Sequence, residues 1–513
     1  MSQDAFSLKK RNWLQQIGFV NGNPFATSEA DRETRLLPEF FVDTGYYHLV
    51  WGDETVPQTT LLFAPRGGGK TAYRVMLQDQ CCPASVDSNV LAVQYTSFEF
   101  ALRELGERGR IDVETHIRKI LWNGLPVLWD ALCKNRKRAA DFPAAQRDQL
   151  GGWLKQFAPA SIEPAQVLVR IQSVEPEFKP SWSDFREHVQ SGRLRELVSP
   201  VGNPVVQLIA DVVESDATFS SNPLSASELL EGFVRLVQAS TEIQAVYVLL
   251  DRLDETTETA DSPETIVALL EPLLANLTLV EMAGLAFKLF LPRSVLSALR
   301  SRRTIRMDRF EIYDIEWEDR LLVEMLRKRL LTYSNSKIQT LAQICASPLA
   351  ESIDQEIVKW VDGSPRQLLQ LGKLLFQVHV DRPGEIPMLL GDEDWATARA
   401  IFLKEHLPLL RIDESAPQAF VGRRRISLTA LEHSFLLALC RSGGWCEKEK
   451  LVDQVWGGGE GVTDQAVSRL VWRIREKIEP QPSVPTYLLT EYGFGFRLEN
   501  AAGLSPSPAV ERK

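Results

Sequence analysis

Short apolar runs in the first part of the chain have the length of buried β-strands. Four such runs occupy residues 59–63, 90–95, 245–250 and 287–291. Because these runs are continuous rather than alternating, they are typical of strands that are covered on both faces. Stretches with helical periodicity lie between them, and this alternation predicts a mostly parallel α/β sheet.

Helical periodicity dominates two longer stretches. Residues 100–235 are rich in tryptophan and are interrupted by prolines, and a capping-box spacing at Ser225 predicts the start of a helix near their end. We expect a helical insertion there, inside a core that covers residues 46–310. Residues 311–410 predict a helical lid, and residues 1–45 a mixed lead-in.

The last part of the chain has a pattern of its own. Residues 411–420 are polar and contain a proline, so we expect a linker there, followed by a compact unit over residues 421–500. Its longest helix is expected over residues 464–478, where apolar residues recur at helical spacing. We also expect a β-hairpin over residues 487–497 and a disordered tail over residues 501–513.

The first predicted strand runs directly into a glycine-rich loop. Glycines let successive backbone N–H groups turn toward one point, so such a loop can cradle phosphate oxygens. We expect Lys70 to reach the phosphates of ATP and the Thr71 hydroxyl to bind Mg²⁺. The pattern G-x-x-x-x-G-K-[ST] holds except that Ala64 replaces the first glycine, and an ordinary strand-to-turn connection is the alternative. The residues expected to bind the nucleotide here are Arg66, Gly67, Gly68, Gly69, Lys70 and Thr71.

An acidic box follows the third predicted strand and contains Asp251, Asp254 and Glu255. A carboxylate at the carboxyl edge of a sheet, beside a phosphate loop, can hold Mg²⁺, and we expect Asp251 in this role. Asp254 and Glu255 are expected to orient or deprotonate the attacking water. The alternative is a solvated acidic turn.

Two arginines are candidates for contacts with the phosphates. Arg293 follows the fourth predicted strand and would emerge at the same edge of the sheet, where it can stabilise the γ-phosphate. Arg366 opens a predicted helix, and a helix N-terminus with an arginine can face a phosphate. The alternatives are a surface arginine and a plain loop-to-helix start.

The glycine loop, the Asp-x-x-Asp-Glu box, the arginine after the next strand and the Gly-Ser-Pro-Arg helix start resemble the STAND and AAA-like ATPases over about residues 20–380. The bacterial STAND-type regulators and the origin-recognition type of ATPase are the most similar. The resemblance implies a P-loop NTPase core with a helical lid, slow ATP hydrolysis, and a domain arrangement that changes with ATP state. If subunits assemble into a homo-oligomer, Arg302 and Arg303 are candidates for an arginine finger. The helical insertion is then a candidate surface for a protein partner.

The helix expected over residues 464–478 places polar residues opposite its apolar stripe. Basic residues recur there every four positions and form a ridge suited to a groove lined with phosphates. We therefore expect double-stranded DNA as a partner. The unit is nearly neutral, with eleven basic and ten acidic residues over residues 421–500, so a protein contact is the alternative. The candidate DNA contacts are Gln465, Arg469, Trp472, Arg473, Lys477 and, in the hairpin, Arg497.

Several short motifs of this unit occur in the order seen in the winged-helix output domain of OmpR/PhoB-type response regulators, which it resembles over about residues 424–498. The resemblance implies a winged helix-turn-helix fold, with a recognition helix in the major groove and a wing against the DNA backbone. Tyr492 stands where that family commonly has a basic residue. No receiver domain is evident upstream. The motifs are Leu-Thr-x-Leu-Glu, Val-Trp-Gly, Val-Thr-Asp-x-x-Val, Arg-x-Arg-Glu-Lys-Ile-Glu-Pro and Gly-Phe-Gly-Phe-Arg-Leu.

Composition narrows the expected partners and compartment. A chain of 513 residues suits about three domains. Its net charge of −10 argues against attraction of the whole molecule to nucleic acid, so a DNA contact requires a local basic face. The six cysteines lack metal-ligand spacing and are expected to be buried free thiols. No segment approaches the ~18 apolar residues of a membrane span, so we expect a cytoplasmic protein without membrane contact.

The leading hypothesis is an ATP-dependent molecular switch that binds DNA through its C-terminal winged helix, as a bacterial transcriptional regulator. One alternative is a signalling or defence-type scaffold that oligomerises with ATP and uses the winged helix for a protein contact. Another is a DNA-remodelling or loader ATPase that resembles origin-recognition proteins.

Overall fold

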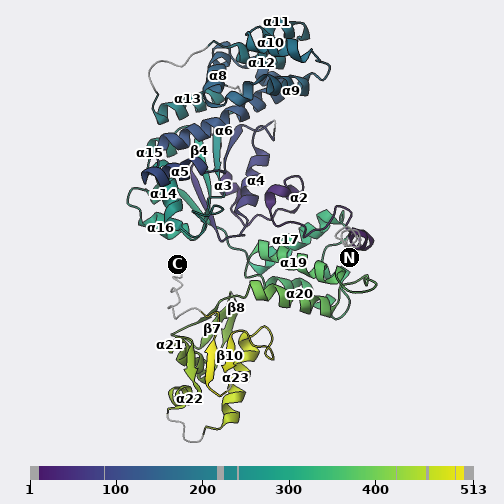
Figure 1. The fold of residues 1–513 in the computed structure, drawn as a ribbon, viewed down its shortest axis with the longest axis vertical. Coiled ribbons are helices and arrows are strands. Elements are labelled where there is room, and N and C mark those ends of the chain that lie inside the picture. Colours follow the sequence, from purple (N-terminus) through teal and green to yellow (C-terminus); the bar gives the residue numbers. More distant parts are fainter. Residues whose placement is uncertain are drawn as a thin grey trace. The chain divides into compact units, whose positions relative to one another are not determined.

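The structure is a computed structural model that describes residues 11–85, 87–216, 224–239, 242–422, 424–457, 462–491 and 493–501. The chain divides into two compact units (Figure 1). The first unit is the continuous segment from Glu29 to Trp317, whereas the second combines the N-terminal segment through Ser28 with the residues from Glu318 onward. A single lead-in over residues 1–45 is therefore wrong, because its two parts belong to different units.

A five-stranded parallel sheet forms the centre of the first unit (Figure 1). The strands are β1 (Thr60–Ala64), β2 (Val90–Tyr95), β3 (Ala245–Leu250), β4 (Leu285–Pro292) and β5 (Glu311–Asp314). Their order in the sheet is β2-β3-β4-β1-β5. β1 to β4 are buried along nearly their whole length, which explains their continuous apolar runs, and the four predicted strands are confirmed.

The fifth strand, β5, has no counterpart in the sequence prediction. Its four residues are exposed or half-buried and two of them are acidic, so no apolar run marks the strand. Because β5 belongs to the sheet, the expected lid cannot begin at residue 311. The first helix of the second unit, α17, begins at Asp319.

Helices surround the sheet and continue into a helical extension between β2 and β3 (Figure 1). One apolar cluster runs from Leu61 and Val248 in the sheet to Trp129 and Ile209 in the extension, so the expected insertion is packed continuously with the core. None of the helices that the structure describes has the length and apolarity of a membrane span. The helices outside the connection from β2 to β3 are α2 (Leu37–Phe40), α3 (Tyr47–Trp51), α4 (Lys70–Gln80), α14 (Pro263–Leu274), α15 (Leu277–Val280) and α16 (Val295–Ser301). Those between β2 and β3 are α5 (Glu99–Arg108), α6 (Val113–Lys134), α7 (Arg136–Asp141), α8 (Ala144–Phe157), α9 (Pro164–Val174), α10 (Trp182–Gln190), α11 (Leu194–Val198), α12 (Pro204–Glu214) and α13 (Ala226–Gln238).

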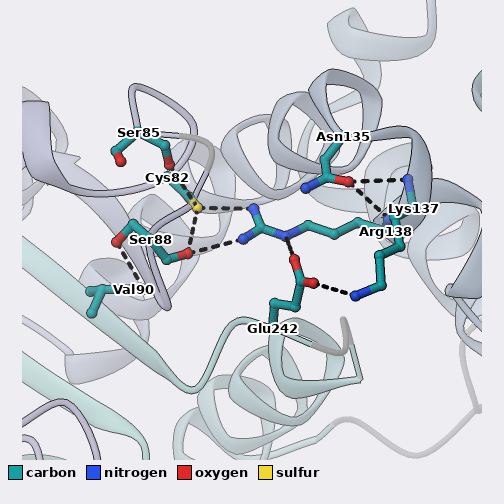
Figure 2. A network of polar contacts seen from close by, with 8 residues as sticks. All are labelled: Cys82, Ser85, Ser88, Val90, Asn135, Lys137, Arg138 and Glu242. Carbon is teal, nitrogen blue, oxygen red and sulfur yellow. Dashed lines mark hydrogen bonds and ion pairs between the residues drawn. The ribbon is translucent and has the colours of Figure 1, made fainter.

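A buried arginine ties the helical extension to the sheet (Figure 2). Arg138 of α7 donates to the Cys82 sulfur and to the Ser88 carbonyl oxygen, each at 3.0 Å. Its Nε donates to Glu242, which lies just before β3, at 3.3 Å. Burial raises the pKa of the Cys82 thiol despite the nearby guanidinium. None of the six cysteines forms a disulfide, and five of them are buried.

In the second unit, the N-terminal segment packs on helices that come much later in the chain. The ring centroids of Trp13, Phe19 and Phe25 lie 5.1, 5.9 and 5.0 Å from that of Phe376. Phe25 also fills the space beside Gly372, where a Cβ atom would lie 2.5 Å from its ring. The helices are α17 (Asp319–Tyr333), α18 (Ile353–Lys359), α19 (Pro365–Val380) and α20 (Asp392–Glu405).

Two small antiparallel sheets and three helices complete the second unit. The expected linker over residues 411–420 is wrong, because β6 and β7 occupy half of it and bury Leu410, Ile412 and Ala419. These strands have only three and four residues, too few to stand out from a polar background. The expected tail lies outside the described residues, apart from Ala501. The elements are β6 (Leu410–Ile412), β7 (Gln418–Val421), β8 (Arg424–Ser427), α21 (Ala430–Arg441), β9 (Trp445–Glu447), α22 (Lys448–Trp456), α23 (Asp464–Ile478), β10 (Leu488–Glu491) and β11 (Gly495–Leu498).

Candidate functional site

The glycine loop joins the end of β1 to the start of α4. Gly67 and Gly69 have φ angles of +77° and +94°, in the left-handed region that favours glycine. Gly68 has no room for a side chain, because a Cβ atom there would lie 2.9 Å from the Pro65 carbonyl oxygen. Gly69 is also the N-cap of α4. The first N–H groups of a helix lack intrahelical partners, so the loop ends at a position that suits an anion.

Lys70 and Asp254 meet beside this loop. The Nζ atom of Lys70 lies 3.6 Å from Oδ2 of Asp254 and 3.5 Å from the carbonyl oxygen of Pro65. The two side chains are only 8% and 13% exposed, so solvent screens their charges weakly. Thr71 follows Lys70 in the first turn of α4 and is half-buried. The structure thus brings the loop lysine and the acidic box into contact.

Asp251, the expected magnesium ligand, is paired with an arginine that the motifs do not reveal. Its Oδ2 atom accepts a hydrogen bond from Nε of Arg74 at 3.1 Å, and both side chains are almost fully buried. Arg74 lies one turn after Lys70 in α4. A basic residue in the first turns after the glycine loop was the sequence signal that could have pointed to it. In the sheet, β4 lies between β1, which leads into the glycine loop, and β3, which leads into the acidic box. Asp254 is the residue of the acidic box that contacts Lys70.

Arg252 extends the cluster of charges at the end of β3. Its φ angle of +67° is uncommon for a residue other than glycine. Its guanidinium contacts Asp31, and its Nε lies 3.7 Å from Oε2 of Glu255. Asp31 also contacts Arg74. Charges of alternating sign therefore surround the acidic box. The links of Asp31 to Arg74 and Arg252 were missed because they join segments far apart in the sequence.

Trp317 covers the glycine loop. Its Nε1 donates to the carbonyl oxygen of Gly68 at 2.9 Å, and its ring would lie 3.6 Å from a Cβ atom on Gly69. The side chain is buried. No local signal in the sequence marks this tryptophan, because its contact with the loop exists only in the folded chain.

A cleft of about 440 Å³ opens at this edge of the sheet. Arg293 borders it, but its guanidinium is held at the end of β5 by hydrogen bonds of 2.9 Å to Asp314 and to the carbonyl oxygen of Ile315. The cleft brings together predicted site residues from the glycine loop, the acidic box and the end of β4. Its lining residues are Pro65, Arg66, Asp254, Thr259, Ala260, Pro263, Ile266, Pro292, Arg293 and Ser294.

Two further arginines of the sequence prediction lie elsewhere. Arg366 is in the first turn of α19, which belongs to the second unit, and its contact with a phosphate stays a prediction. Arg302 pairs with Glu264 at 2.9 Å on the surface of the first unit. A role for Arg302 or Arg303 in a neighbouring subunit also stays a prediction.

The helix predicted over residues 464–478 is confirmed as α23, and the Thr463 side chain caps it by accepting a hydrogen bond from the Ala466 N–H. Its predicted apolar stripe is buried. Gln465, Arg469 and Arg473 are exposed on the other side. Trp472 is 47% exposed there. This face is therefore available for a partner.

Lys477 does not belong to the exposed basic ridge, contrary to the prediction. Its Nζ lies 2.6 Å from Oε2 of Glu432 and donates to the carbonyl oxygen of Ser427 at 3.2 Å. Burial alone would raise the pKa of the Glu432 carboxyl, but hydrogen bonds from Lys477 and Thr429 hold this pKa below its usual value. Lys477 therefore fastens the end of α23 to the start of α21.

The hairpin of β10 and β11 is held to α23 by an arginine that was not predicted. Arg475 donates to the carbonyl oxygen of Leu488 at 3.0 Å and to the hydroxyl of Thr490 at 2.8 Å. Arg497, predicted as a DNA contact, pairs with Glu491 at 3.2 Å and with Glu499 at 3.1 Å. Its charge is thus partly balanced within the hairpin. Tyr492 lies outside the described residues.

Comparisons with known proteins concern this C-terminal part. A family model described as "Transcriptional regulatory protein, C terminal" matches residues 422–498. The DNA-binding response regulator MtrA of Mycobacterium leprae (strain TN) is 35% identical over 96 residues, which is 18% of this chain and 43% of MtrA. The probable transcriptional regulator ycf27 of Cyanophora paradoxa is 31% identical over 96 residues, 18% of this chain and 40% of ycf27. The chain thus spans less than half the length of these relatives.

The matched range agrees with the fold and with the order of motifs in the sequence. It contains the helix pair α22 and α23 and the β10–β11 hairpin, which follow one another as in a winged helix-turn-helix. Residues 422–498 are therefore an OmpR/PhoB-type DNA-binding domain.

Proposed function

We propose that the chain is an ATP-responsive regulator of transcription that binds double-stranded DNA through its C-terminal domain. The family of that domain supports the DNA half of the proposal. The nucleotide half rests on one observation above all. The Nζ of Lys70 lies 3.6 Å from Asp254, where the glycine loop, the start of α4 and the acidic box converge.

ATP is the proposed ligand of the glycine loop. The backbone N–H groups of Gly67, Gly68 and Gly69 and the start of α4 would bind phosphate oxygens. Lys70 would exchange its contact with Asp254 for the β- and γ-phosphates. The adjacent cleft of about 440 Å³ is within the usual size of a ligand site, and Arg66 and Arg293 on its border offer positive charge to the phosphates.

Mg²⁺ is the proposed companion of ATP, with Thr71 and Asp251 as its protein ligands. Among the described residues, no group of three or more His, Cys, Asp or Glu side chains is arranged to hold a metal ion. This agrees with an ion that is held largely by phosphate oxygens and water. When bound, Mg²⁺ would neutralise charge on the phosphates. Arg74 keeps the Asp251 carboxylate oriented through its hydrogen bond of 3.1 Å.

Slow ATP hydrolysis to ADP and phosphate completes the proposed switch. Asp254 borders the cleft, and Glu255 follows it directly in the chain; both would orient or deprotonate a water molecule. Arg293 borders the same cleft and would stabilise charge on the γ-phosphate after release from Asp314. The bound nucleotide would then favour one arrangement of the chain over another.

Double-stranded DNA is the proposed partner of α23. Arg469 and Arg473 lie one turn apart on its exposed face, and cations at this spacing can contact phosphates along a groove. Gln465 and Trp472 share this face and would lie against base edges. Arg497 of the hairpin would contact the backbone once released from its acidic neighbours.

Binding of the full chain to duplex DNA, measured with and without an ATP analogue and Mg²⁺, tests the proposal. We expect affinity that depends on DNA sequence, salt and nucleotide. Turnover stimulated by any duplex would instead favour a loader ATPase. Nucleotide-driven assembly without DNA binding would favour a protein scaffold and overturn the DNA half of the proposal.

A further inference from the structure

The chain passes between the two compact units at two places, after Ser28 and after Trp317. Each crossing is next to a residue that is linked to the proposed nucleotide site, directly in the case of Trp317 and through two arginines in the case of Asp31. Asp31 lies just after the first crossing, in a short 3₁₀ helix over Ala30–Arg32. Trp317 is the last residue before the second crossing.

At the first crossing, Asp31 is linked to the acidic box through two arginines. Its Oδ1 contacts Nη2 of Arg74, and its Oδ2 contacts Nη2 of Arg252. Arg74 donates in turn to Asp251 at 3.1 Å, whereas Arg252 lies 3.7 Å from Glu255. Charges of alternating sign therefore connect the proposed magnesium ligand and the proposed base to the same carboxylate.

Burial makes these connections sensitive to a change of charge. The side chains of Arg74 and Asp251 are 2% and 1% exposed, and that of Asp31 is 28% exposed. Ion pairs in such surroundings are screened weakly, and a buried charge that loses its partner is costly. A cation or a triphosphate at the acidic box would therefore alter the pairing of Asp31.

At the second crossing, Trp317 contacts the glycine loop itself. Its Nε1 donates to the carbonyl oxygen of Gly68, and its ring lies against Gly69. Rotation of these peptide units around a phosphate would move the acceptor of this hydrogen bond. The position of Trp317 therefore depends on the conformation of the glycine loop, as the pairing of Asp31 depends on the charges at the acidic box.

Beyond each crossing, the chain reaches the same helix, α17. This helix begins at Asp319, immediately after the second crossing. Its last turn holds the segment that precedes the first crossing, because Asn21 donates to the carbonyl oxygens of Thr332 at 2.8 Å and of Tyr333 at 3.0 Å. The chain segments at the two crossings, which we call the first and second connectors, are therefore both attached to α17 of the second unit.

We propose that Asp31 and Trp317 are positioning residues that couple the nucleotide site to α17 through the two connectors. A change of charge at the acidic box alters the pairing of Asp31 and so affects the first connector. A change of conformation in the glycine loop shifts Trp317 and so affects the second connector. This inference rests on the proposed binding of ATP at the glycine loop.

Hydrogen exchange of the full chain, with and without a non-hydrolysable ATP analogue and Mg²⁺, tests the coupling. We expect the analogue to change exchange in peptides covering residues 11–28 and 318–333 by about ten-fold, a typical size for coupling between sites. Asp31→Asn should abolish the response of residues 11–28, and Trp317→Phe that of residues 318–333. The affinity for the analogue, titrated in parallel, should change by no more than about the same ten-fold, because coupling is reciprocal.

Matched variants separate coupling from folding. Glu29→Gln makes the same change of charge two positions earlier, where Glu29 pairs with Arg32 at the surface, and should keep both responses. Arg252→Gly suits the φ angle of +67° and removes the link to Asp31, so it should mimic Asp31→Asn without backbone strain. Trp182→Phe, at an exposed position, is the control for Trp317.

The outcomes distinguish this inference from the function on which it rests. If the wild-type chain does not bind the analogue, the proposed nucleotide site and the coupling both fail. If it binds the analogue but exchange at both connectors is unchanged, or if Asp31→Asn and Arg252→Gly respond like the wild type, only the coupling is overturned.

Discussion

Lys70 is held in the folded chain by two oxygen atoms that a nucleotide would replace. Its ammonium lies 3.6 Å from Asp254 and 3.5 Å from the Pro65 carbonyl oxygen, in a largely buried position. Such a charge gains much from a phosphate partner, because little water competes for it. At the scale of the residue, replacing Lys70 therefore tests most directly whether the glycine loop binds ATP.

We expect Lys70→Ala to weaken ATP binding by roughly 10- to 100-fold, because a hydrogen bond to a charged group contributes about 1.5–3 kcal/mol. Titration calorimetry with ATP and Mg²⁺ measures the effect. Lys359→Ala, which removes a surface lysine paired with Glu356, is the control. Equal affinity in the wild type and Lys70→Ala would contradict the assignment of the site.

His116 gives the first unit a predicted sensitivity to acid. It is fully buried, and its Nδ1 lies 2.7 Å from the hydroxyl of Tyr95. Burial lowers its pKa from 6.5 to about 4, so the unfolded chain binds a proton between these values that the folded chain does not. The free energy of unfolding should therefore fall by up to about 3 kcal/mol as pH drops from 6.5 to 4.

Thermal unfolding across this pH range tests the prediction. His116→Gln should reduce the dependence on pH, because glutamine does not titrate, while His48→Gln at an exposed position should keep it. A wild-type chain whose stability does not change over this range would show that His116 is not buried in its neutral form.

At the scale of the element, α23 shows how one helix divides its basic residues between two tasks. Arg469 and Arg473 are exposed, whereas Arg475 holds the hairpin and Lys477 holds Glu432 of α21. Arg475 and Lys477 lie at opposite borders of the buried stripe, so each meets a different neighbour. Their different roles arise from neighbours that the helix meets only after folding.

We expect Arg469→Ala with Arg473→Ala to weaken binding to duplex DNA and to lower the slope of log affinity against log salt by about 0.9 for each lost phosphate contact. Fluorescence anisotropy with a labelled duplex at several salt concentrations measures both. Lys477→Ala should leave the slope unchanged but destabilise the domain by about 1–2 kcal/mol, because the buried Glu432 loses its partner while Lys477 itself is partly exposed. An unchanged slope in the double variant would contradict a DNA contact at this face.

At the scale of the whole molecule, the chain combines a unit with a candidate nucleotide site and a unit that contains the DNA-binding domain. A nucleotide can control DNA binding only if its affinity differs between the arrangement of the chain that binds DNA and the arrangement that does not. The two connectors supply a physical route for such an effect, since each begins at the candidate site and leads to α17.

We expect Glu255→Gln to retain ATP with slower turnover, and Lys70→Ala to bind ATP more weakly. At an ATP concentration that, with Mg²⁺, saturates Glu255→Gln but leaves most of Lys70→Ala unoccupied, their affinities for one duplex should differ by about ten-fold, because typical coupling free energies are 1–3 kcal/mol. Anisotropy measures the affinities, and mass photometry of the same samples reports any change in assembly. Equal affinities in the two variants would mean that the nucleotide does not control DNA binding.

The sequence by itself determined the features that depend on neighbouring residues. The four buried strands follow from their apolar runs, the capping box of α13 from Ser225, and α23 from its stripe. The glycine loop also follows, because positive φ angles at Gly67 and Gly69 need glycine whatever surrounds them. The OmpR/PhoB-type domain was recognisable for the same reason, since its motifs are local and ordered.

Only the tertiary structure decided the partners of the charged residues. Asp251 is held by Arg74, Lys477 by Glu432, and the loop by Trp317, and each pair joins segments far apart in the sequence. A periodic pattern records which face of an element is buried, but it does not record which distant side chain will meet it there. The same limit hid β5, whose place depends on pairing with β1 rather than on apolar residues of its own.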